Sequence, residues 1–172
     1  MVKSIIPTLL VLVLAACSET QETSAPQKET QTAEMPTAQE GSFDINRDES
    51  GRALRGYDAV AYFTQSKPVE GKAEYSHDWH DAKWQFVSAD NRDKFAQNPE
   101  KYAPANGGYC TFGIVLRKKF DGDPNVWRIT QDKLYIFLNE KVQGKFFQDE
   151  EGNFQKVAGN WSYVEGKDAG DL

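Results

Sequence analysis

Residues 84–104 constrain the fold of this chain more than any other stretch. Trp84 and Phe86 alternate with polar neighbours, which is typical of a strand with one buried face. Ser88 can accept hydrogen bonds from the free amides of a following helix, and that helix should end before the next Asn-Pro step. Phe95 is the one large apolar residue of the helix, so we expect it to pack back on the strand. This stretch predicts one compact strand–helix unit.

Residues 1–17 have the pattern of a bacterial lipoprotein signal peptide. Lys3 supplies a positive charge, and the apolar run that follows is too short to span a bilayer stably. The sequence Leu-Ala-Ala-Cys at 14–17 resembles a lipobox, which implies cleavage and a diacylglyceryl anchor at Cys17; the alternative is a plain signal peptide that contains a cysteine. Ser18 after the cysteine favours the outer membrane, facing the periplasm, by resemblance to other bacterial lipoproteins.

Residues 18–42 are expected to be a disordered tether. They contain five Glu, one Lys, no aromatic residue and no Leu, Ile or Val, so they cannot bury enough apolar surface to offset the entropy of ordering. The folded domain is therefore expected at residues 43–172, which hold all 4 Trp, 7 Tyr and 10 Phe of the chain. Of the net charge of −6, the leader contributes +1 and the tether −4, which leaves −3 for this domain. A mildly acidic domain argues against nucleic acid as a partner, and solubility is the simplest role of this charge.

Alternating and helical patterns predict a small α+β domain in which antiparallel β-hairpins pack against short helices. The expected elements are a strand or helical turn at 56–63, a hairpin at 73–88 with its turn at 80–82, a strand at 111–116, a turn at 121–125, a second hairpin formed by 127–130 and 133–138, a helix at 140–148 capped by Asn139, and Trp161 closing the core near the C-terminus. The sequence predicts no internal repeat.

Cys110 is the only cysteine of the expected domain, because Cys17 belongs to the anchor. Most structural cysteines of an oxidising compartment are paired, so a lone thiol there is buried and inert, bound to a metal, or redox-active. Gly107 and Gly108 precede it and allow close approach of the backbone to a ligand. All three states of the thiol remain open at this point.

His77 and His80 are the only histidines, and with Cys110 they are candidate ligands for copper or zinc. Positions three apart on a strand point to opposite faces, so convergence on one metal requires the turn at His80 to fold that side chain back. The alternative places His77 on an aromatic face with Tyr75 and Trp79, and makes His80 an ordinary turn residue.

Asp58 is a carboxylate inside an apolar run and needs a partner if it is buried. It either caps a nearby turn or lines a small pocket with Tyr57 and Tyr62. Asp58, Tyr62 and Cys110 are therefore the candidate residues for binding a small ligand. The sequence contains no Ser-His-Asp order, phosphate loop or nucleotide fingerprint, so it offers no positive argument for an enzyme.

The combined pattern resembles the YHS-domain lipoproteins and the YHS domain-containing (seleno)proteins. The segments that carry the resemblance are 56–63, 84–102, 103–110 and the Asp-Pro, Trp and Lys-Leu-Tyr motifs between 123 and 135, within about residues 54–163. The resemblance implies a small α+β module at 43–172, of a kind described as a presumptive heavy-metal or copper-binding domain. Metal-handling members carry cysteines at the positions of Ala61, Val87 and Asn91, so the thiolates that would hold a soft metal are missing here.

Three functions are expected from these observations. The leading one is a membrane-tethered, non-enzymatic binding module of the bacterial cell envelope, for a copper or zinc ion or for a small ligand. The second is a thiol-redox protein that acts through Cys110. The third is an envelope protein–protein interaction domain with a partner that the sequence does not name.

Overall fold

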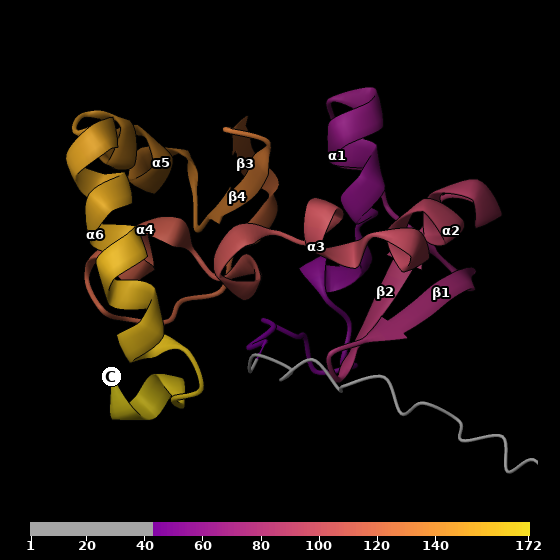
Figure 1. The fold of residues 1–172 in the computed structure, drawn as a ribbon, viewed down its shortest axis with the longest axis horizontal. Helices are drawn as coiled ribbons and strands as arrows, with labels where there is room; N and C mark the ends of the chain where they lie inside the picture. Colours follow the sequence, from indigo (N-terminus) through magenta and orange to yellow (C-terminus); the bar gives the residue numbers. More distant parts are fainter. Residues whose placement is uncertain (1–42) are drawn as a thin grey trace, which may run out of the picture. The chain divides into compact units, whose positions relative to one another are not determined.

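Two antiparallel hairpins, each followed by two helices, form the framework of residues 43–172, which are the residues that the computed structural model describes (Figure 1). The predicted signal peptide and tether lie outside them. The strands are β1 (Lys72–Trp79), β2 (Ala82–Phe86), β3 (Asp123–Thr130) and β4 (Lys133–Phe137). The α-helices are α1 (Ala59–Gln65), α2 (Ala89–Gln97), α3 (Pro99–Tyr102), α4 (Thr111–Val115), α5 (Glu140–Phe147) and α6 (Glu150–Val164). The short 3-10 helices are η1 (Leu54–Gly56), η2 (Ala105–Gly108) and η3 (Ala169–Asp171). The predicted α+β class, with antiparallel hairpins and short helices, is confirmed.

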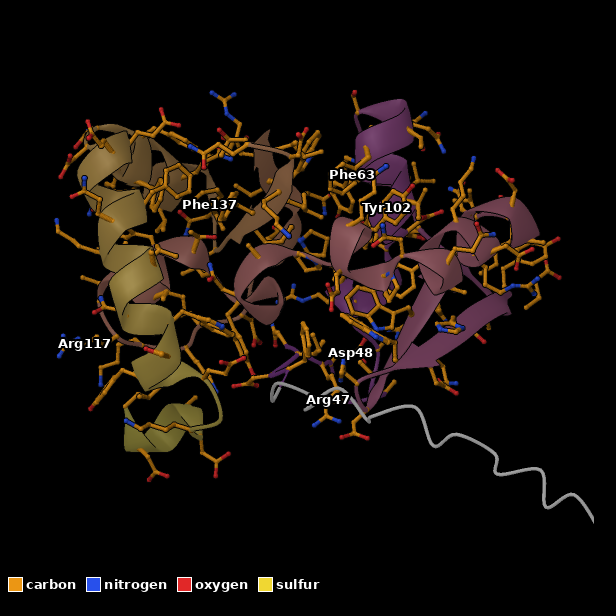
Figure 2. All side chains as sticks on the ribbon, in the orientation of Figure 1. Arg47, Asp48, Phe63, Tyr102, Arg117 and Phe137 are labelled. Atoms are coloured by element: carbon orange, nitrogen blue, oxygen red, sulfur yellow. The ribbon has the colours of Figure 1, made fainter. Side chains whose placement is uncertain are left out.

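The central unit forms as its sequence predicts. The Ser88 hydroxyl accepts a hydrogen bond from the Asn91 amide at 3.2 Å and caps α2. The Phe95 ring then packs back on β2, with ring centroids 4.8 Å from Trp84 and 5.1 Å from Phe86. All three rings are buried in the first apolar core. Phe63 and Tyr102 meet edge to face beside this core, with centroids 5.6 Å apart (Figure 2).

The second half of the domain repeats the backbone of the first. β3 begins at Asp123, 51 residues after β1 begins at Lys72, and β4 and α5 follow β2 and α2 at the same interval. Both hairpins carry a bulge at the same place, between Lys72 and Ser76 in β1 and between Asp123 and Trp127 in β3. The expectation of no internal repeat was therefore wrong.

Few side chains reveal the repeat, which is why the sequence conceals it. Phe86 matches Phe137 at the ends of β2 and β4, and Phe95 matches Phe146 in α2 and α5. Most other matched positions hold different residues with the same local conformation. The repeat is conserved in backbone geometry, since caps, turns and bulges tolerate several residue types.

The two-residue turns of the hairpins show this equivalence well. His80 and Asp81 have φ angles of +48° and +56°, and Gln131 and Asp132 have +49° and +55°. Two successive residues with positive φ match the right-handed twist of the strands that they join. The same turn thus closes each hairpin, with a different first residue and an aspartate as the second.

Strand β4 links the two apolar cores. Leu134 and Ile136 are buried in the first core together with residues of the first repeat. Phe137 is buried in the second core with Phe146 and Ile114 (Figure 2). Strand β4 is therefore covered on both faces.

Two predicted elements differ from the structure near Cys110. Residues 111–116 were expected to be a strand but form the helix α4, in which the Gly113 amide donates to the Cys110 carbonyl at 2.8 Å. A short apolar run has no period that separates a buried strand from a helical turn. Residues 123–125, expected in a turn, begin β3 instead.

The sequence reading also missed α6, the longest helix of the described residues. Its buried or half-buried residues Phe154, Val157, Trp161 and Val164 recur at helical spacing. Glycines within the helix weaken this signal because they are poor helix formers. No helix within residues 43–172 is both long enough and apolar enough to cross a membrane.

Candidate functional site

Asp58 is a buried structural hub. Its Oδ1 accepts hydrogen bonds from the amides of Val60 at 2.8 Å and Ala61 at 3.1 Å, which caps α1. Its Oδ2 accepts from the Val87 amide at 2.9 Å and from Asn91 Nδ2 at 2.7 Å. The three positions at which the resemblance would place cysteines, 61, 87 and 91, therefore surround this carboxylate. Four hydrogen bonds occupy it, so Asp58 acts as a cap and cross-link between segments.

Tyr62 joins the two repeats. Its hydroxyl donates to the Pro124 carbonyl at 2.9 Å, and its ring meets Trp127 edge to face at 5.2 Å. Burial, with a smaller contribution from nearby acidic groups, raises the pKa of this hydroxyl far above its ordinary value. Tyr62 is fully buried, so it exposes no surface that a ligand could contact.

Cys110 has the place in the second repeat that Asp58 has in the first. Each residue is the N-cap of a short helix, and their amides donate to equivalent carbonyls, Asp58 to Val69 at 2.9 Å and Cys110 to Phe120 at 2.8 Å. The Cys110 sulfur accepts from the Leu138 amide at 3.2 Å, and the residue is only 1% exposed. Asp58 and Cys110 therefore belong to separate hydrogen-bond networks. The sequence had predicted that they line one shared pocket.

The candidate metal ligands do not come together. His77 lies on β1 opposite Trp84, with its ring 6.0 Å from Phe95, and is half-buried on the aromatic face. His80 is in the turn, stacked on Phe43 at 4.1 Å. Within residues 43–172 no group of three His, Cys, Asp or Glu side chains is arranged to hold a metal ion. His77, His80 and Cys110 thus do not fit the copper or zinc site that the sequence suggested.

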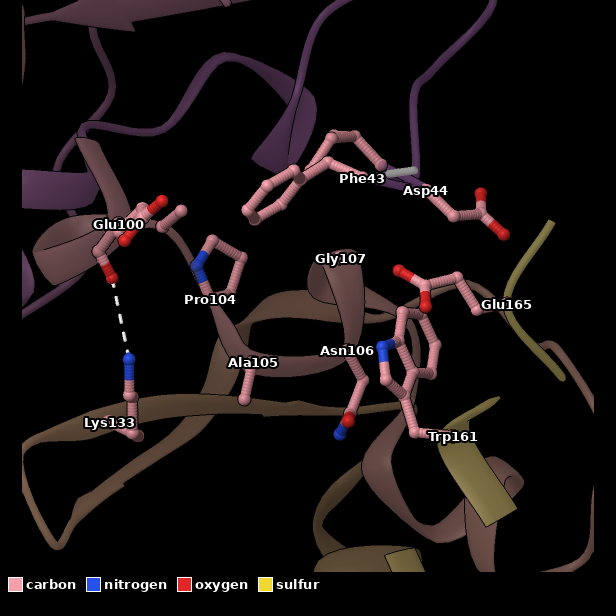
Figure 3. A pocket seen from close by; sticks show the side chains of 12 residues that line it. Phe43, Asp44, Glu100, Pro104, Ala105, Asn106, Gly107, Lys133, Trp161 and Glu165 are labelled. Atoms are coloured by element: carbon pink, nitrogen blue, oxygen red, sulfur yellow. Dashed lines mark hydrogen bonds between the residues drawn. The ribbon is translucent and has the colours of Figure 1, made fainter. Parts of the chain in front are cut away.

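A cleft of about 330 Å³ lies where four segments distant in sequence meet (Figure 3). The N-terminal segment contributes Phe43, and β4 begins at the cleft with Lys133. The loop that leads into η2 supplies a further wall, and the end of α6 contributes Trp161 and Glu165. The lining residues are Phe43, Asp44, Ile45, Glu100, Ala103, Pro104, Ala105, Asn106, Gly107, Lys133, Trp161 and Glu165.

The two carboxylates beside Trp161 differ in their partners. Asp44 forms an ion pair with the buried ammonium of Lys119, and it accepts from the Tyr109 hydroxyl at 3.1 Å and the Gly166 amide at 3.0 Å. None of the ion pairs among residues 43–172 involves Glu165. Partial burial and then the negative charge of Asp44 raise the pKa of the Glu165 carboxyl. Lys119 and the Trp161 side chain partly offset this shift, so Glu165 is a carboxyl without an ion pair but with polar neighbours.

Asn106 also lines the cleft and has a left-handed backbone conformation that asparagine adopts readily. Its φ of +54° places it in the left-handed region, which only some non-glycine residues adopt readily. Its Nδ2 is buried without a hydrogen-bond partner, and within the described part of the chain no other buried side-chain polar atom is in that state. An unsatisfied buried donor has a substantial energetic cost, and this atom is buried beneath the surface of the cleft.

The sequence reading singled out none of Phe43, Asn106 and Glu165, and it assigned Trp161 to the core alone. A local signal existed for one pair, since Trp161 and Glu165 are four residues apart and share a face at the end of α6. Phe43 and Asn106 had no such signal. Only the fold brings them to the same cleft.

Comparisons with protein-family models, curated proteins and solved structures find no match for this chain. The resemblance to YHS-domain proteins therefore stays a prediction from the residues. The function has to be argued from the site itself.

Proposed function

We propose that this chain is a non-enzymatic binding module of the bacterial cell envelope, tethered through a lipid on Cys17 at the outer membrane, and that the cleft beside Trp161 takes a small ligand. The observation that carries the proposal is the combination of features in this cleft. Aromatic walls and a carboxyl at Glu165 without an ion-pair partner line one space of about 330 Å³. Concave, partly apolar sites with a few polar groups are where small molecules bind.

The thiol-redox alternative has less support. A reactive cysteine needs access and a stabilised thiolate, whereas Cys110 is buried below Leu138 and accepts one amide hydrogen bond. Phe120 and Leu138 next to it are exposed apolar residues. They favour a protein–protein interaction surface in that region as a second candidate function. The cleft is the better-defined site because polar and apolar groups converge there.

Blocking the cleft tests the proposal. Ala105→Phe introduces a ring into the lining, and Ala96→Phe on the exposed side of α2 is the matched control. We expect some members of a panel of amines, carboxylates, sugars and Cu²⁺ or Zn²⁺ salts to raise the melting temperature of the wild type and of Ala96→Phe, because a ligand that binds only the folded state stabilises it. Ala105→Phe should lose that response. A panel without any stabilising compound, or equal responses in both variants, would contradict a binding function for the cleft.

The anchor is tested separately with Cys17→Ala in the full chain. We expect this variant to move from the membrane fraction to the aqueous extract, because a lipid chain provides the membrane affinity. Fractionation of the variant with membranes would show that another part of the chain binds them.

A further inference from the structure

We propose that the ligand of this cleft is a small organic cation, an ammonium group with apolar substituents. This inference rests on the proposed binding function and names its ligand class. It is argued from the charge and the rings that line the cleft.

The charge at the Trp161 end of the cleft favours a cation. Glu165 is the C-cap of α6, so the partial negative charge of a 15-residue helix adds to its carboxylate there. Asp44 is paired with Lys119, whereas no ion pair among residues 43–172 involves Glu165. Partial burial and the negative charge of Asp44 raise the pKa of Glu165, and a cation bound in the cleft would favour its ionised form.

The one lining cation is at the other end. Figure 3 shows Lys133 beside Glu100, and its ammonium donates to the Glu100 carbonyl at 3.5 Å. Glu165 and Trp161 lie together away from this pair (Figure 3). The Trp161 end therefore keeps a net negative character.

The rings of the cleft suit an alkylated ammonium group. Phe43 and Trp161 both line the space, and the face of an aromatic ring attracts a cation electrostatically. Ile45 and Pro104 add apolar surface for the methyl or methylene groups of such a ligand. A metal ion would gain nothing from these walls, since hard cations prefer oxygen ligands and softer ones need nitrogen or sulfur.

The size of the cleft sets the second requirement. The volume of about 330 Å³ is at the small end of ligand sites, which limits the ligand to a compact molecule.

Three probes of nearly the same shape test the inference in the full chain. Choline carries the ammonium and a hydroxyl, 3,3-dimethylbutan-1-ol is its neutral isostere, and glycine betaine adds a carboxylate. We expect choline to bind at least about tenfold more tightly than the neutral isostere, as measured by calorimetry, because the charge interacts with Glu165 and the rings. Betaine should bind more weakly than choline, since its carboxylate opposes Glu165.

Two variants locate the effect. Glu165→Gln should weaken choline binding about tenfold and leave the neutral isostere unchanged, whereas Glu74→Gln on the exposed part of β1 is the control and should change neither. Phe43→Leu, at a partly exposed ring that lines the cleft, should weaken choline binding as well.

The outcomes separate this inference from the proposed function. Equal binding of choline and its neutral isostere, absence of choline binding, or a choline affinity that Glu165→Gln leaves unchanged would overturn the cation assignment. If another compound of the panel then stabilises the wild type and not Ala105→Phe, the binding function stands without it. If no compound does, both proposals fail.

Discussion

Asp58 and Cys110 occupy equivalent positions in the two repeats and accept hydrogen bonds from equivalent amides. The Val87 amide, directly after β2, donates to Asp58, and the Leu138 amide, directly after β4, donates to Cys110. The first repeat thus uses a carboxylate where the second uses a thiol. A carboxylate has two acceptor oxygens and gathers four donors, whereas the sulfur accepts one.

Asp58→Ala should destabilise the domain more than Cys110→Ala. Removing Asp58 leaves buried amide donors without an acceptor, each at a cost of roughly 1–3 kcal/mol, so we expect a loss of about 3 kcal/mol or more in the free energy of unfolding. Cys110→Ala leaves only the Leu138 amide without its acceptor, so it should lower the free energy of unfolding by less. Urea denaturation of both variants measures the difference, and an equal or smaller loss for Asp58→Ala would refute the role of this hub.

The native thiol of Cys110 should resist labelling. The residue is 1% exposed, so a thiol reagent should react only after the domain unfolds. In the Cys17→Ala chain Cys110 is the one remaining thiol, which makes the count unambiguous. Rapid stoichiometric labelling of the native domain would restore the thiol-redox alternative.

The matched phenylalanines of the repeats should be of similar importance. Phe95 and Phe146 are fully buried in their respective cores, so Phe95→Ala and Phe146→Ala should each cost about 3–5 kcal/mol. Phe120 is 45% exposed, and Phe120→Ala is a control that should change the unfolding free energy little. A loss below about 1 kcal/mol at Phe95 or Phe146 would mean that its helix does not pack on its hairpin through this ring.

Glu165 should make stability depend on pH. The folded-state pKa of Glu165 is raised above its ordinary value, so the folded domain holds this proton more tightly than the unfolded chain does. The carboxylate of Glu165 therefore destabilises the fold at neutral pH, and this effect is lost as the pH falls through the raised pKa toward the ordinary value. The groups that face it are Asp44, which opposes its ionisation, and Lys119, which favours it.

Melting curves of Glu165→Gln and of the wild type check this linkage. The variant should be the more stable at pH 7, and the two should converge as the pH is lowered below the ordinary glutamate range. A variant that is less stable than the wild type at pH 7 would show that the ionised Glu165 has a favourable partner in the folded state.

Local sequence patterns were enough to predict the main helices and turns of this protein. Ser88 and Asn139 cap the helices that their positions predict, and Phe95 packs on the strand before it. The turns at His80 and Gln131 also lie where the apolar patterns place them. Each of these features depends on interactions within about ten residues of chain, which a sequence pattern records directly.

Three features follow from tertiary packing and not from local sequence: the repeat, the separation of Asp58 from Cys110, and the cleft. The repeat is hidden because caps, bulges and turns admit several residue types, so two halves with few identical side chains share one backbone. The cleft joins Phe43 to Trp161 and Glu165 across most of the domain. Contacts between such distant segments depend on how the hairpins and helices pack together, and no local pattern in the chain carries that information.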